Sequence, residues 1–154
     1  MSAFSNTSIE IISIPSSVFS IGEKCFMNTL IKSAFFDIKS VCKNISEKSF
    51  FNTSLISISL PNSVAFIGNY AFAHCIYLKF VSYCSSVYQE NKNIFDKSDL
   101  LLNVSVPNYY LHSSFCGLPA LNYGYCKYGS VPKCPLCVYK SHQSVYVYLC
   151  VLFE

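Results

Sequence analysis

The sequence predicts a strand-rich α/β solenoid of about five turns, each about 23 residues long. One observation is that residues 7–26, TSIEIISIPSSVFSIGEKCF, recur in closely similar form as residues 53–72, TSLISISLPNSVAFIGNYAF, 46 positions later. A second is a proline after an apolar, Ser, apolar triplet at Pro15, Pro61 and Pro107, with half-way markers at Asp37 and Cys84. These markers divide the chain into units spaced by 22, 24, 23 and 23 residues.

Length and composition agree with one folded domain. The chain has 154 residues, of which 52% are hydrophobic, so a sizeable core is available. Eleven Lys and Arg residues stand against eight Asp and Glu residues, and no run of like charges occurs. Because nucleic-acid binding depends on cations that follow the phosphate backbone, we expect no nucleic-acid partner.

Each unit is expected to begin with a short strand. The triplets at residues 12–14, 58–60 and 104–106 place a serine between two apolar and mostly β-branched residues. This period of two predicts a strand with one buried face. The following proline has no amide donor and therefore suits the end of the strand.

A glycine corner and a buried aromatic ring are expected to follow the strand. Gly22 and Gly68 come directly after an isoleucine, where the backbone requires either a positive φ or a close approach to a neighbour. An aromatic residue with no partner in its own turn must pack on the next turn, where burial contributes roughly 1.5 to 3 kcal/mol per side chain. The recurring rings are Phe26, Phe50, Phe72 and Phe95.

The pattern L-x-x-I-x-I-P-x-x-V-x-x-I-G-x-x-A-F, taken from residues 55–72, resembles the leucine-rich repeats of the BspA-like surface antigen family. Residues 9–26 match it nearly as well, and the resemblance covers residues 7–115. The departures are Asp37 and Cys84 in place of proline, a two-residue insertion before Phe50, and Phe115, which follows Pro107 by eight residues instead of eleven.

The resemblance implies a right-handed leucine-rich-repeat solenoid with one principal strand per turn. It also implies a second extended segment near residues 18–21 and a helical turn near residues 23–26. We therefore expect a solenoid over residues 7–119 and a non-repeat tail, rich in Cys and Tyr, over residues 120–154.

Outward positions of the principal strands form the candidate protein-binding face. Hydroxyl groups with a few exposed aromatic rings suit adaptable hydrogen bonding to another protein. The alternative for each serine is that it is only a solvated strand residue. The candidate residues are Ser13, Phe35, Ser57, Ser59, Phe80, Ser82, Asn103 and Ser105.

The cysteines offer the only other site chemistry in the sequence. The spacing C-x7-C-x2-C-x4-H at Cys126, Cys134, Cys137 and His142 lacks the paired ligands of a zinc finger, so we assign neither a metal nor a cofactor. Disulfide or redox use of Cys134 and Cys137 is a second interpretation, and a loosely ordered tail is a third. The remaining expectation is that most of Cys25, Cys42, Cys75 and Cys84 are reduced, buried residues.

No motif for catalysis is present. The sequence contains no phosphate-binding glycine loop, nucleophile elbow or H-E-x-x-H, and its carboxylates share no repeat position. The longest apolar run, residues 145–153, is shorter than the roughly twenty residues of a membrane span. We therefore predict a protein that is not an enzyme and has no transmembrane segment in this chain.

Two functional hypotheses follow. The resemblance implies a surface-exposed or secreted module that adheres to host or matrix protein, although no signal peptide is visible. The other is a truncated or degenerate copy of the family with only a structural role or no function. Four N-glycosylation sequons, at Asn6, Asn44, Asn52 and Asn103, would matter only in a secretory compartment.

Overall fold

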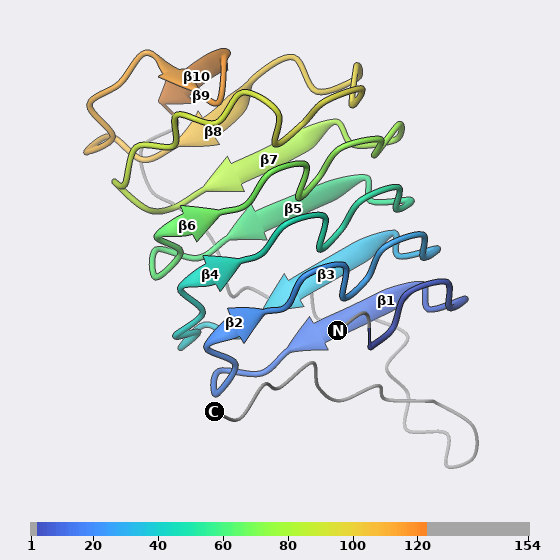
Figure 1. Ribbon diagram of the computed structural model, residues 1–154. Helices are drawn as coiled ribbons and strands as arrows, with labels where there is room; N and C mark the ends of the chain where they lie inside the picture. Colours follow the sequence, from blue (N-terminus) through green and yellow to red (C-terminus); the bar gives the residue numbers. More distant parts are fainter. Residues whose placement is uncertain (1–2, 123–154) are drawn as a thin grey trace, which may run out of the picture.

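The computed structural model describes residues 3–122, which form a stack of short coils (Figure 1). The elements of residues 3–122 are all strands, separated by turns. The principal strands are β1 (Ile11–Ile14), β3 (Ser33–Phe36), β5 (Ser57–Leu60), β7 (Phe80–Tyr83) and β8 (Val104–Val106). The shorter strands are β2 (Ser20–Ile21), β4 (Asn44–Ile45) and β6 (Phe66–Ile67), and the C-terminal pair is β9 (Ser114–Phe115) and β10 (Leu118–Asn122).

The principal strands form one sheet in the order β1-β3-β5-β7-β8-β10-β9, and every neighbouring pair except β10 and β9 is parallel. Successive strands therefore need a crossover, which each coil supplies. The predicted spacing is confirmed, because the register gaps are 22, 24, 23 and 23 residues. The pairs are Ile11 with Ser33, Ser33 with Ser57, Ser57 with Phe80, and Ser82 with Ser105.

A second, three-stranded parallel sheet runs along the other side of the stack, in the order β2-β4-β6 (Figure 1). It confirms the second extended segment expected near residues 18–21. The sheet ends at β6 because the side chain of Gln89 replaces the next strand. The Ile67 amide donates to Gln89 Oε1 at 3.3 Å, and Gln89 Nε2 donates to the Ala65 carbonyl at 3.0 Å.

The aromatic residues stack along the coil as predicted. Phe50 lies between Phe26 and Phe72, with ring centroids 5.1 and 5.2 Å away, and Phe72 stacks on Phe95 at 5.8 Å. One further member was not predicted from the sequence: Phe4 stacks on Phe26 at 5.6 Å. We call this column the phenylalanine ladder.

The helical turn expected at residues 23–26 is not formed. Lys24 and Asn28 have φ of 54° and 58°, a left-handed conformation that an α-helix does not contain. The amides of this segment are also used between coils: the Phe26 amide donates to the Ser49 carbonyl at 2.8 Å, and the Phe50 amide to Ala71 at 2.8 Å. Tight turns thus take the place of a helix.

A recurring Phe-x-Asn-Thr sequence explains these turns. It occurs at residues 4–7, 26–29 and 50–53, and its asparagines tolerate the left-handed conformation at little cost. Their side chains bond from coil to coil, because Asn28 Nδ2 donates to Asn6 Oδ1 at 3.0 Å and Asn52 Nδ2 donates to Asn28 Oδ1 at 3.0 Å. The sequons at Asn6 and Asn52 coincide with this structural motif.

Gly68 is required by a close backbone approach. Gly117 is the glycine of residues 3–122 with a positive φ, so neither Gly22 nor Gly68 needs one. A Cβ atom on Gly68 would lie 2.5 Å from the Glu47 amide nitrogen and 2.8 Å from the Ser46 carbonyl carbon. Of the two roles expected for this glycine, close approach is correct.

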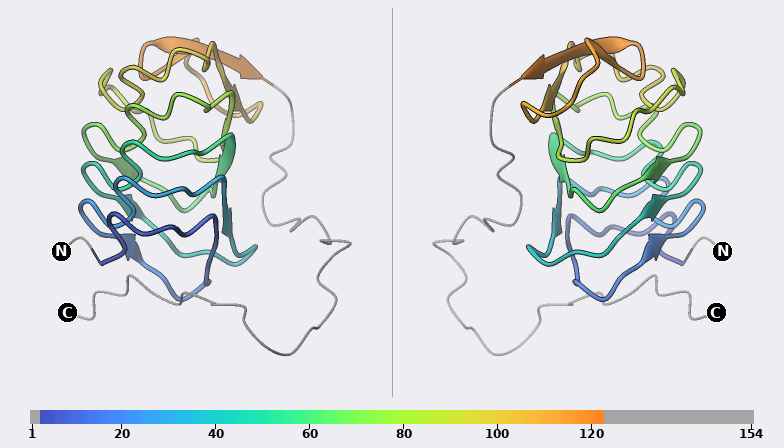
Figure 2. Two further views of the ribbon diagram at one scale, coloured as in Figure 1. Left: turned by 90° about the vertical axis from the view of Figure 1, so that its right-hand side faces the viewer. Right: turned by 90° about the vertical axis from the view of Figure 1, so that its left-hand side faces the viewer.

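A β-hairpin closes the C-terminal end of the described stack. Cys116 and Gly117 both have positive φ, which suits a two-residue turn between β9 and β10. Figure 2 shows β10 lying across the end of the coils. The ring of Phe115, fully buried, lies 4.5 Å from that of Tyr83. The displaced position of Phe115 in the sequence thus reflects this closing element.

Truncating a ladder residue should cost much more than truncating an exposed ring. Phe72→Ala removes a fully buried side chain between two neighbours, so we expect a loss of about 3 to 5 kcal/mol in the free energy of unfolding. The matched control is Phe80→Ala, at a ring 67% exposed, with an expected loss below about 1 kcal/mol. Denaturant titration of both variants checks this, and equal losses would contradict the ladder.

Gly68→Ala should destabilise the chain by about 1 to 3 kcal/mol, because the new methyl group meets backbone atoms that cannot move aside cheaply. Ser46→Ala at the equivalent position of the preceding coil is the control and should stay within about 0.5 kcal/mol of the wild type. Thermal or chemical unfolding would measure both. A neutral Gly68→Ala would refute the close approach.

Candidate protein-binding face

The outward side chains of β1, β3, β5, β7 and β8 lie on one face of the large sheet. Side chains alternate between the two sides of a strand, so Ile12 and Ile14 are buried whereas Ser13 between them is exposed. The parallel register then aligns the outward positions: Ser13 pairs with Phe35, Ser57 with Phe80, and Ser59 with Ser82. The sequence-predicted residues are therefore neighbours in space; we call this surface the principal face.

The principal face combines half-buried hydroxyls with exposed apolar side chains. Ser59, Ser82, Asn103 and Ser105 are all of intermediate exposure. The ring of Phe80 is 67% exposed, Ser13 and Ser57 are also exposed, and Phe35 is half-buried. The face can thus offer hydrogen-bonding groups beside an apolar anchor.

Two exposed apolar residues of this region were missed by the sequence analysis. Ile56 and Leu102 directly precede the outward strand positions and are 47% and 72% exposed. Ile11, at 67%, begins β1. An apolar residue two places before the alternating triplet is the signal that would have found Ile56 and Leu102.

Charge contributes little to the principal face. An ion pair joins adjacent coils beside it, with Lys32 Nζ 3.0 Å from Glu10 Oε1, and both side chains are more than half exposed. Exposed pairs of this kind contribute roughly 0 to 1 kcal/mol. Apolar side chains and hydroxyl groups therefore make up most of the principal face.

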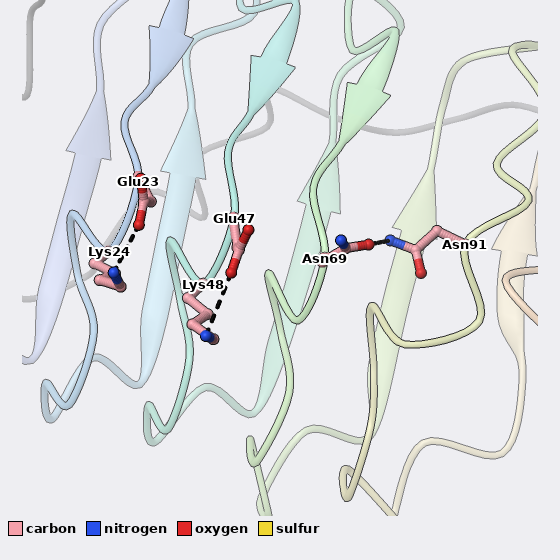
Figure 3. Close-up of polar contacts among 6 residues, drawn as sticks. All are labelled: Glu23, Lys24, Glu47, Lys48, Asn69 and Asn91. Atoms are coloured by element: carbon pink, nitrogen blue, oxygen red, sulfur yellow. Dashed lines mark hydrogen bonds and ion pairs between the residues drawn. The ribbon is translucent and has the colours of Figure 1, made fainter.

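A separate row of polar side chains follows the short strands at the corners of the coils (Figure 3). Glu23 pairs with Lys24 at 2.7 Å, Glu47 pairs with Lys48 at 3.3 Å, and Asn91 donates to Asn69 in the following coils. The hydrogen bond and the charge of Lys24 lower the pKa of Glu23, whose side chain is 52% exposed. The side chains of this row are thus paired with one another.

The buried thiols are poor nucleophiles. Burial raises the pKa of Cys42 to about 11 and that of Cys116 to about 12, and it also raises the pKa of Cys75. These three cysteines are free and, as thiols, react weakly because the thiolate is the reactive form. Cys25 and Cys84 are disulfide-bonded, so the expectation of reduced cysteines is wrong for these two.

The weak metal-binding candidates of the sequence, Cys126, Cys134, Cys137 and His142, lie outside the described residues. Within residues 3–122 no group of three or more His, Cys, Asp or Glu side chains could hold a metal ion. A search of the same residues found no helix long and apolar enough to cross a membrane.

Comparison with known proteins gives one family match. A family model described as the BspA type leucine rich repeat region, in six copies, matches residues 1–115. The crystal structure of the pneumococcal vaccine antigen PcpA is similar at 26% identity and a TM-score of 0.56, over 68% of this chain and 32% of that one. A leucine rich cell surface protein from Faecalibacterium prausnitzii A2-165 has 16% identity and a TM-score of 0.49, over 75% of this chain and 42% of that one.

The chain thus spans less than half the length of either solved structure. No curated protein matches its sequence significantly.

Proposed function

Because the chain belongs to the BspA-type leucine-rich repeat family, we propose that it is a non-enzymatic, surface-antigen-like module that binds host or matrix protein in adhesion. The similarity to a pneumococcal antigen supports a position at the cell surface or outside the cell. The observation that carries the proposal is the principal face, where aligned serines lie in the same and neighbouring strands as the exposed ring of Phe80.

The composition of the principal face favours a protein partner. Protein interfaces are typically depleted of charge at their centre and enriched in aromatic residues, with polar groups around them. Phe80 and Leu102 supply exposed apolar surface, and Ser57, which pairs with Phe80 in the sheet, supplies a hydroxyl beside the ring. Since coils of nearly constant length present these groups at a regular spacing, a partner can contact several of them at once.

Charged substitutions at Ser59 and Ser82 should weaken adhesion to a matrix-coated surface. These residues lie opposite each other in β5 and β7, so Ser59→Glu with Ser82→Lys places opposite charges side by side and preserves the fold. Both new charges would have to be desolvated against the partner, and we expect at least about a tenfold loss of apparent affinity. Adhesion assays with the purified full chain measure it.

The matched control makes the same two changes outside the principal face, as Ser17→Glu with Ser86→Lys at two exposed serines that lie outside the strands. The control should adhere like the wild type, and circular dichroism should show both variants folded. Equal adhesion of folded face and control variants would reject the principal face as the binding surface. A folded wild-type chain that adheres to no matrix protein would favour the alternative of a degenerate family copy.

A further inference from the structure

The small sheet presents a second exposed apolar surface, away from the principal face. Phe19 before β2 is 54% exposed, Phe66 in β6 is 56% exposed, and Tyr88 is 44% exposed. Leu111, at 89%, is the most exposed large apolar side chain of the described residues. We call the surface formed by Phe19, Lys43, Phe66, Tyr88 and Leu111 the second face.

Hydrogen bonds from coil to coil place these residues in one continuous strip. The Lys43 amide donates to the Phe19 carbonyl at 2.8 Å, and the Ala65 amide donates to the Lys43 carbonyl at 2.9 Å. The bond from Gln89 Nε2 to the Ala65 carbonyl then brings Tyr88 beside Phe66. The ring of Tyr88 in turn contacts that of His112, next to Leu111, in a tilted arrangement with a centroid distance of 4.2 Å.

The strip is arranged symmetrically about its middle coil. Phe19 in the first coil and Leu111 in the fifth are both apolar and occupy equivalent outward positions. The second coil carries Lys43, and the fourth carries Tyr88 and, at the following corner, Glu90. The middle coil carries Phe66. The apolar residues at both ends and in the middle of the strip therefore meet apolar residues when a second copy is placed against it with the order of the coils reversed.

We propose that the second face binds a second copy of this chain, about a two-fold axis that runs along β6. A rotation about this axis reverses the order of the coils but leaves the position of each residue along its strand unchanged. It brings Phe19 of one copy over Leu111 of the other, and Phe66 against its own counterpart. The two small sheets would pack face to face, about 10 Å apart as sheets usually do.

Charge supports the same arrangement. The side chain of Lys43 lies over the Phe19 ring, with Nζ 5.6 Å from the centroid. The ion pairs of residues 3–122 join Lys24 to Glu23, Lys32 to Glu10 and Lys48 to Glu47, so neither Lys43 nor Glu90 belongs to one. In the two-fold pair the second coil faces the fourth, which places Lys43 of each copy beside Tyr88 and toward Glu90 of the other.

Sedimentation equilibrium of the full chain over a wide concentration range tests the proposal. We expect a monomer–dimer equilibrium, and Phe66→Ser should raise its dissociation constant about a hundredfold, because the ring is lost from both copies at the axis. Phe80→Ser on the principal face is the matched control and should leave the equilibrium unchanged. Leu111→Ser, a more exposed position, provides a second variant if Phe66→Ser does not fold.

A charge exchange makes the test specific for the two-fold geometry. Lys43→Glu and Glu90→Lys should each weaken the dimer, and the double variant should recover most of the loss. A chain that stays monomeric at every concentration overturns the proposal. So does a dimer that Phe80→Ser weakens as much as Phe66→Ser, or a double variant no better than the single ones. Because adhesion depends on the principal face, failure here leaves the proposed function untouched.

Discussion

The structure depends on the burial of each coil's apolar side chains against the coils on either side. At the phenylalanine ladder, ring stacking and backbone pairing occur at the same residue: the amide of Phe26 bonds to the next coil, as do those of Phe50 and Phe72. The spacing of the coils must therefore satisfy both interactions at once. One coil alone has neither, which is why such proteins are stabilised by their nearest-neighbour interfaces.

The aligned principal face follows from this constraint. Coils of nearly constant length keep successive strands in register, so an outward serine such as Ser59 lies beside its equivalent, Ser82. Where the repeat weakens, other groups take over the pairing. The amide side chain of Gln89 ends the small sheet, and the β9–β10 hairpin with the buried ring of Phe115 closes the large one. At the other end, the Phe4 amide bonds to the Cys25 carbonyl and its ring extends the ladder.

Sequence periodicity was sufficient to predict the strand spacing, the four-membered ladder and the outward serines, because each rests on a residue type repeated at a fixed interval. The helical turn was predicted wrongly because every second amide of residues 24–28, such as that of Phe26, donates to the adjacent coil, which the sequence of one coil does not reveal. Gln89 was missed for a similar reason, since a single residue that replaces a strand has no repeat to reveal it. The place of Phe4 in the ladder could have been predicted from the sequence, because Phe4 begins the same Phe-x-Asn-Thr sequence that is found at residues 26–29. On the principal face, alternation identified the serines but not Ile56 and Leu102, which precede the alternating residues.

A double-mutant cycle between Phe50 and Phe72 tests the central claim most directly. The free energy of unfolding would be measured for each single alanine variant and for the double variant. Because the two rings stack at 5.2 Å in adjacent coils, we expect a coupling energy of about 0.5 to 1.5 kcal/mol. Strict additivity of the two losses would mean that the coils do not stabilise one another through these rings, and would contradict the account.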